Sequence, residues 1–202
     1  MVSGAPGQDV GPPRSGDIAP VATSHYAAIA EGFYSGTIAA LGGERWRIEN
    51  RGALQTVRFD RASLKSVDFE RSEGVVGQRH HLGSLFVALD ADVARGVVAL
   101  KDDARPDRDP EAPVPYLISA RWPVKGLDRN QAGFAFHAQG FGKGEFAWKV
   151  PAGGRFAVEV DDGARKHRFT AASDPEGRLE FTVPGEGVHG VDIAVRRLVD
   201  TQ

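Results

Sequence analysis

The chain has 202 residues, of which 41% are hydrophobic and 26% are charged, an ordinary composition for a globular protein that allows one large all-β domain or two small ones. The formal net charge of −2 excludes a strong field of one sign, so we expect no nucleic-acid partner. The lack of cysteine excludes disulfides and thiolate-bound metals, and no apolar run reaches the roughly 20 residues that a membrane-spanning helix needs.

Residues 1–23 are rich in Gly, Pro and Ser and show no apolar period, which predicts a disordered leader. They also lack the basic and apolar regions of a signal peptide. Residues 24–43 are predicted to form the only helix, because apolar residues recur there near helical spacing, as at Tyr26, Ile29 and Phe33. We expect the glycine pair that follows Leu41 to end this helix.

From Trp46 onward the apolar period changes to two, and turn sequences such as DG at 162–163 and DPEG at 174–177 separate the alternating runs. Residues 44–202 therefore predict an antiparallel β-sandwich or jelly roll, which makes the fold class mainly β with one N-terminal helix. The charged, proline-rich stretch 101–115 interrupts the pattern. We favour a loop within one sandwich, although a linker between two β lobes is the open alternative.

Two adjacent histidines, His80 and His81, lie in the alternating stretch VVGQRHHLGSLFVALD, residues 75–90. Neighbouring side chains on a strand point to opposite faces, so the two imidazoles are poorly placed to bind one ion, and we expect no metal and no cofactor. A structural or ligand-contacting role is favoured. The histidines remain weak catalytic candidates, as a general base beside a carboxylate such as Asp68 or Glu70.

Aromatic and acidic side chains are the remaining candidates for ligand binding. Trp122, Trp148 and Tyr116 could form a stacking platform for sugar rings, with burial in the core as the alternative for each tryptophan. Trp122 is the best candidate for exposure, because it lies beside a proline and two basic residues. Asp107 and Asp109 belong to an acidic run, 102–111, that could attract a cationic amino sugar.

The glycine-rich stretch AQGFGKGEF, residues 138–146, is not a phosphate-binding loop, because no lysine followed by Ser or Thr opens a helix there. Its glycines lie between alternating aromatic residues. That arrangement predicts a hairpin or a bulge.

The runs RWRIENRGALQTVRFD and SEGVVGQRHHLGSLFVALD resemble the C-terminal region of the Pel-type exopolysaccharide-modifying proteins. These are large periplasmic proteins with a glycoside hydrolase domain and a polysaccharide deacetylase domain, and the resemblance covers residues 17–198. It implies a β-rich, jelly-roll-like module that follows the deacetylase, with SHYAAIAEGFYSG as the helix that closes the deacetylase barrel. The family's metal-binding Asp and His motif and its base Asp are missing here, so no catalytic residue is carried over.

The resemblance implies a periplasmic, non-catalytic accessory module of a polysaccharide deacetylase system. Such a module would brace the deacetylase or contact an amino-sugar polymer, and its partner would be the deacetylase domain or a second copy, bound through Tyr26, Ile29 and Phe33. The alternative is a small carbohydrate-active enzyme, an esterase or lyase that uses His80 or His81 as general base.

Overall fold

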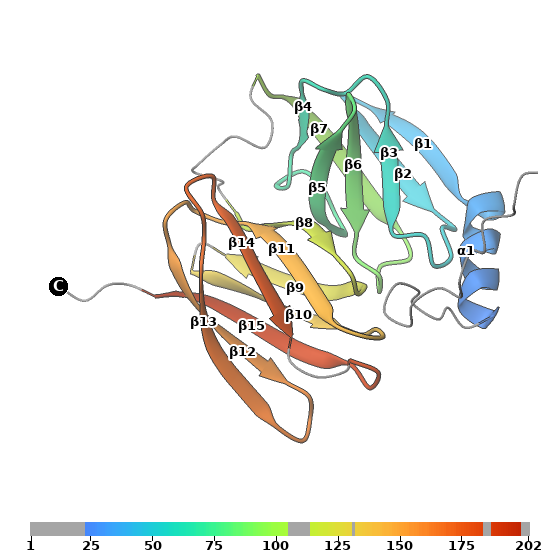
Figure 1. Cartoon of the computed structure of the whole chain (residues 1–202). Helices are drawn as coiled ribbons and strands as arrows, with labels where there is room; N and C mark the ends of the chain where they lie inside the picture. The colour runs from blue at the N-terminus through green and yellow to red at the C-terminus, as the bar shows by residue number, and fades with distance from the viewer. Residues whose placement is uncertain (1–22, 105–113, 131, 184–186, 199–202) are drawn as a thin grey trace, which may run out of the picture.

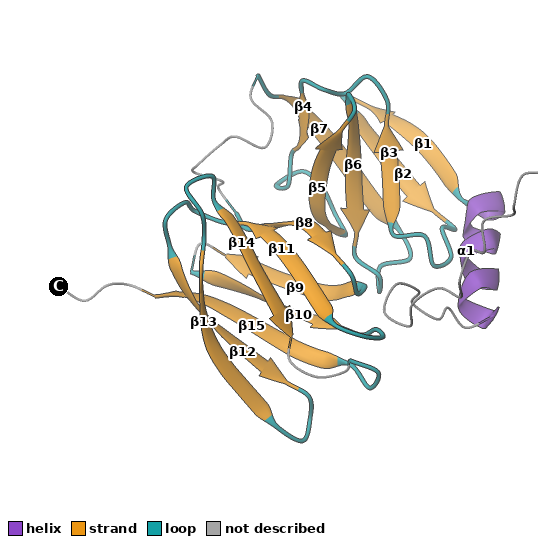
Figure 2. Cartoon of the chain, viewed as in Figure 1, coloured by secondary structure: helices purple, strands orange, loops and turns teal. Residues whose placement is uncertain are grey.

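The computed structural model describes residues 23–104, 114–130, 132–183 and 187–198. Within these residues the chain has fifteen strands and one helix, arranged as packed sheets (Figures 1 and 2). This confirms the predicted fold class, mainly β and sandwich-like with an N-terminal helix. The predicted leader falls almost wholly outside the described residues.

The helix α1 spans Thr23–Ser35. The strands, in chain order, are β1 (Thr37–Gly42), β2 (Arg45–Glu49), β3 (Thr56–Phe59), β4 (Lys65–Val67), β5 (Val75–His81), β6 (Ser84–Leu89), β7 (Gly96–Asp102), β8 (Tyr116–Ala120), β9 (Val124–Asn130), β10 (Gly133–Ala138), β11 (Gly144–Lys149), β12 (Arg155–Asp161), β13 (Lys166–Ala172), β14 (Arg178–Val183) and β15 (Val191–Leu198).

The strands form three sheets. An N-terminal sheet has the order β1-β2-β7-β4, a C-terminal sheet has the order β13-β12-β15-β10-β9, and a central sheet has the order β14-β11-β8-β5-β6-β3. The central sheet therefore draws half of its strands from each side of residues 101–115. Its two halves meet between β5 and β8, which run parallel and share a single register pair, Gly77 with Leu117.

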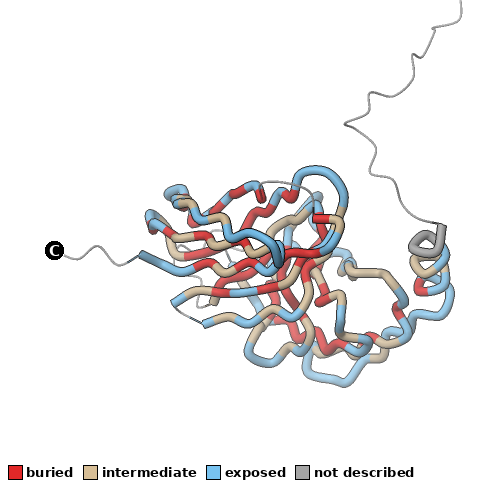
Figure 3. The backbone as a smooth tube through the Cα atoms, turned by 90° about the horizontal axis from the view of Figure 1, so that it is seen from below, coloured by how far each residue is buried: buried red, intermediate tan, exposed pale blue. Residues whose placement is uncertain are grey.

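Two separate hydrophobic cores lie against the central sheet. Leu85, Val87 and Leu89 of β6 point into the N-terminal core, whereas Ala88 of the same strand packs against the C-terminal core. Because alternate residues of a strand face opposite ways, the two outer sheets cover opposite faces of the central sheet. Buried segments accordingly run through both halves of the molecule (Figure 3). The structure thus has two sandwiches that share one sheet, in place of the single sandwich that the sequence favoured.

Strand β12 shows how the alternating pattern produces this packing. Phe156, Val158 and Val160 are buried in the C-terminal core, while the residues between them are partly exposed. The DG sequence at 162–163 then turns the chain, and β13 pairs antiparallel with β12. The alternation of apolar residues and the turn sequence therefore predicted this hairpin correctly.

The predicted helix 24–43 is wrong in its second half, because α1 ends at Ser35 and residues 37–42 form the edge strand β1. Ile38 of β1 pairs with Ile48 of β2 in an antiparallel ladder. The apolar residues of this stretch fit a strand as well as a helix, so pairing with β2 decided between the two. A Cβ at Gly32 would lie 1.8 Å from the carbonyl oxygen of Arg51, so this glycine lets α1 approach the loop after β2.

Arg129 of β9 ties the two sandwiches together at their junction. Its guanidinium donates hydrogen bonds to the carbonyl oxygens of Val75 and Pro115, each 3.1 Å away. It also lies 4.5 Å from the ring centroid of Phe69, which stacks on Tyr116. Burial lowers the pKa of Arg129 to about 10. A partly buried guanidinium is tolerated here because carbonyl oxygens and an aromatic face replace the water that it has lost.

Candidate functional site

The two histidines occupy opposite faces of β5. His80 lies opposite Leu85, on the face of the N-terminal core, and its Nε2 is 2.7 Å from the carbonyl oxygen of Lys65. Since a carbonyl only accepts hydrogen bonds, Nε2 carries the proton in this arrangement. His81 is exposed next to the turn that joins β5 to β6. The strand geometry separates the two imidazoles, as the sequence led us to expect.

The carboxylates considered as catalytic partners have other surroundings. Asp68 forms an ion pair with Arg71, with 3.9 Å between Oδ2 and Nη1, and its Oδ1 accepts a hydrogen bond from the Arg71 amide. Glu70 is exposed. Within the described ranges, no group of three or more His, Asp and Glu side chains is arranged to hold a metal ion.

The predicted aromatic platform is not exposed. Trp122 retains only 2% of its surface accessible, and Trp148 and Tyr116 are also buried. Trp148 packs against Phe134 with 4.2 Å between ring centroids, inside the C-terminal core. Burial, the alternative considered for each tryptophan, is what the structure has, so these rings form no open stacking platform. Trp122 nevertheless belongs to the lining of the cavity described below. Asp107 and Asp109 lie outside the described residues.

The glycine-rich stretch instead provides room for Trp122. A Cβ would lie 2.2 Å from the indole at Gly140, 2.6 Å at Gly144 and 2.4 Å at Gly187. The indole Nε1 donates a hydrogen bond of 3.1 Å to the carbonyl oxygen of Phe141. These glycines let two backbone segments, the glycine-rich stretch and the one at Gly187, approach the large ring closely.

A cavity of about 450 Å³ lies where β5 and β8 separate. The strands share only the pair of Gly77 and Leu117, and beyond it each follows its own sandwich. On one side the cavity is lined by residues of β5 and β6, of which Arg79, His81 and Phe86 face away from the N-terminal core. On the other side it is lined by β8 and the segment that leads into β9. The polar and aromatic lining residues that matter below are Thr56, Arg79, His81, Phe86, Ser119 and Arg121.

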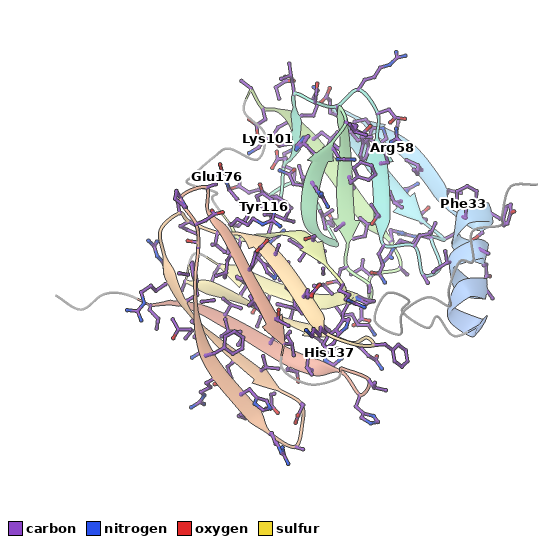
Figure 4. All side chains as sticks on the ribbon, in the orientation of Figure 1. Phe33, Arg58, Lys101, Tyr116, His137 and Glu176 are labelled. Carbon is purple, nitrogen blue, oxygen red and sulfur yellow. The ribbon has the colours of Figure 1, made fainter. Side chains whose placement is uncertain are left out.

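The register explains why these side chains share one wall. Arg79 of β5 lies opposite Phe86 of β6, which in turn lies opposite Arg58 of β3. The guanidinium of Arg58 is 5.8 Å from the centroid of the Phe86 ring. Figure 4 shows Arg58 on the N-terminal sandwich. Sequence analysis singled out His81 and Trp122 of this lining. It did not bring the lining together, because the residues come from separate strands and match no short motif.

A second hollow lies on the face of β11 and β14 that points away from the C-terminal core. It meets the first cavity at Ser119 and Arg121. Its charged residues include both signs, since Glu145 and Glu180 line it together with Arg178. Arg178 and Glu180 form an ion pair of 2.5 Å. This hollow therefore has no strong preference for charge of one sign.

A separate apolar surface covers α1 and β1, at the edge of the N-terminal sandwich away from the C-terminal one (Figures 1 and 4). Phe33 and Tyr34 of α1 are 75% and 87% exposed, and Ile38 and Leu41 of β1 are also exposed. Strand β1 is the outer strand of its sheet and pairs only with β2 among the described strands. Of the three residues predicted to contact a partner, Phe33 is exposed and Ile29 is partly buried. The side chain of Tyr26 is not among those that the structure describes.

No protein-family model matches the chain, and no curated protein matches it. The 13-residue α1 is too short to cross a bilayer, and no other helix occurs within the part of the chain that the structure describes.

Proposed function

We propose that the chain is a non-catalytic accessory module of a polysaccharide-modifying system. In this proposal the cavity between β5 and β8 contacts carbohydrate, and the surface of α1 and β1 docks to a catalytic domain. The cavity carries the proposal, because it is a concave site that combines apolar wall with hydrogen-bonding side chains. Its volume of about 450 Å³ lies in the range typical of small-ligand sites.

The lining suits a sugar ring. A pyranose has an apolar C–H face and a rim of hydroxyl groups, so it needs an apolar wall together with several hydrogen-bonding groups. Phe86 and Leu117 supply apolar surface, while Thr56 and Ser119 supply hydroxyl groups. The guanidinium of Arg79 adds donors in a planar fork.

The apolar surface of α1 and β1 supports docking to another domain. Large apolar side chains gathered on one exposed face usually mark an interaction surface, and an open edge strand can accept a further strand. The resemblance of the RGALQTVRF stretch favours a polysaccharide deacetylase domain as the partner. It also supports a periplasmic location and an exopolysaccharide as the polymer. A second copy of the chain is the other partner that this surface could accept.

Carbohydrate binding is tested by calorimetric titration with a panel of neutral, acidic and amine-bearing oligosaccharides. Phe86→Ala should weaken binding of the best oligosaccharide several-fold, because it removes apolar surface from the cavity wall. Tyr34→Ala is the matched control, since it removes an exposed aromatic ring on α1 and should leave the affinity unchanged. Heat changes for no member of the panel would contradict carbohydrate binding.

Docking is tested by sedimentation of the chain alone and with the deacetylase domain. Replacing Phe33 and Tyr34 by Ser, and Ile38 by Lys, should abolish association. Leu64→Ser serves as control, because Leu64 is an exposed apolar residue between β3 and β4. A strict monomer both alone and in the presence of the deacetylase domain would contradict docking through this surface. Carbohydrate binding would still be judged by titration.

A further inference from the structure

We infer that the cavity between β5 and β8 selects a sugar unit that bears a carboxylate, such as a uronic acid, over neutral and amine-bearing sugars. This inference rests on the proposed carbohydrate function and adds the chemical class of the ligand.

The first support is the sign of the charges around the cavity. Arg79, Arg121 and His81 line it, and none of the described residues that line it is Asp or Glu. The whole chain has more acidic than basic residues, 27 Asp and Glu against 25 Lys and Arg. A lining with two guanidinium groups and no carboxylate among its described residues therefore departs from the chain as a whole, and it favours an anion.

The second support is that these two arginines are available to a ligand. Some exposed arginines of the central and C-terminal sheets are neutralised, as Arg58 is by Asp60 at 2.7 Å and Arg168 is by Glu159 at 2.7 Å. Within the described residues, Arg79 and Arg121 take part in no ion pair, and both are exposed. A carboxylate that enters the cavity would meet guanidinium groups whose donors are not already used by protein carboxylates.

The third support is the shape of the site. Beyond Gly77 and Leu117 the strands β5 and β8 share no ladder, so their backbone edges border the cavity from two sides. Phe86 and Leu117 provide apolar wall next to the charged groups. A small inorganic anion would use the arginines alone, whereas a sugar acid would use the arginines and the apolar wall together.

The same lining disfavours a deacetylated amino sugar. In its protonated form the amine would meet like charge at Arg79 and Arg121. The resemblance of the sequence implied an amino-sugar polymer, and an acidic run that could attract it. The cavity has the opposite charge preference, so the amine-bearing form of such a polymer should bind there most weakly.

The test measures affinity for four probes by calorimetry at low salt: trigalacturonic acid, its methyl ester, a deacetylated chitotriose and inorganic phosphate. The free acid should bind at least about tenfold more tightly than the ester, in which a methyl group replaces the negative charge. Arg79→Gln combined with Arg121→Gln should abolish this difference. Arg155→Gln on β12 is the matched control, because Arg155 is likewise exposed and lies outside the cavity lining; it should retain the difference.

Equal affinity for acid and ester would overturn the selection of a carboxylate and leave the proposed carbohydrate function standing. Phosphate binding as tight as that of the trisaccharide would overturn the assignment of a sugar acid, since the apolar wall would then contribute nothing. Binding of no oligosaccharide would overturn both proposals. Circular dichroism of each variant verifies that it is folded, as expected for substitutions of exposed side chains.

Discussion

Gly77 of β5 lies opposite Leu117 of β8, and a Cβ at Gly77 would stand 1.9 Å from the Leu117 carbonyl oxygen. The two sandwiches share the central sheet through this contact. Only a residue without a side chain allows the two backbones to approach so closely. The same contact places the branch point of β5 and β8, and therefore the cavity, where it is.

Gly77→Ala should lower the free energy of unfolding by about 2–3 kcal/mol, because the added methyl group must displace the backbone of β8. Urea titration measures this change. Gly96→Ala on β7 is the matched control, since its added Cβ would meet only Glu73 at 3.4 Å and Leu89 at 3.6 Å. An equal, small effect of both substitutions would show that the β5–β8 contact adapts without cost.

Trp122→Ala should cost about 3–5 kcal/mol of stability, because it empties a large buried site. Gly144→Ala should also destabilise the protein, since its Cβ would lie 2.6 Å from the indole. The two substitutions together should cost less than the sum of their separate effects, as the smaller residue at 122 relieves the clash. Strictly additive effects in a thermal or urea series would contradict this account of the three glycines around Trp122.

Arg129→Lys should destabilise the protein by about 2–3 kcal/mol despite keeping the charge. An ammonium group cannot reproduce the planar set of hydrogen bonds to Val75 and Pro115 while it stacks on Phe69. Urea unfolding followed by fluorescence measures the change. Arg155→Lys, at an exposed position of β12, should have almost no effect. If the Arg129→Lys variant were as stable as the wild type, a positive charge alone would be enough to stabilise the junction of the two sandwiches.

Leu82→Asn should raise the free energy of unfolding by about 0.5–1 kcal/mol, because it relieves backbone strain in a turn. Leu82 and Gly83 form the two-residue turn between β5 and β6, with φ of 48° and 78°. Positive φ at both positions is typical of a type I′ turn, in which Asn-Gly is the preferred sequence. The leucine side chain is 90% exposed, so little packing is lost. A drop in melting temperature would contradict the assignment of strain at Leu82.

Asp162→Asn should alter how stability depends on acid pH. Hydrogen bonds from the amides of Ala164 and Arg165 hold the pKa of Asp162 below its ordinary value of 3.8. A carboxyl group whose folded pKa is depressed contributes stability above its unfolded pKa and loses it as the pH falls through the folded pKa.

Asparagine keeps an oxygen acceptor for these amides but does not titrate. The wild type should therefore be the more stable protein at pH 7, and the difference in melting temperature should shrink below about pH 4. A difference in melting temperature between the two proteins that stays constant from about pH 7 to about pH 2 would show that the Asp162 charge does not contribute.

The sequence determined the parts of the structure that depend on local pattern. Alternation over residues such as Phe156, Val158 and Val160 produced the strands of the C-terminal core, and the DG sequence at 162–163 produced the turn after them. The separation of His80 and His81 followed from the same alternation. These features depend only on neighbouring residues, so the chain itself carries the information.

Tertiary structure decided what depends on pairing between distant segments. Residues 37–42 have an apolar composition that fits either a helix or a strand, and pairing with β2 made them a strand. Trp122 lies beside a proline and two basic residues, yet three glycines from distant positions enclose it. The cavity exists because β5 and β8 meet only at Gly77 and Leu117, which are 40 positions apart in the chain. Burial and site geometry depend on contacts between distant segments, which no local pattern encodes. Arg79 and Arg121 therefore came to line one cavity only once the sheets were assembled.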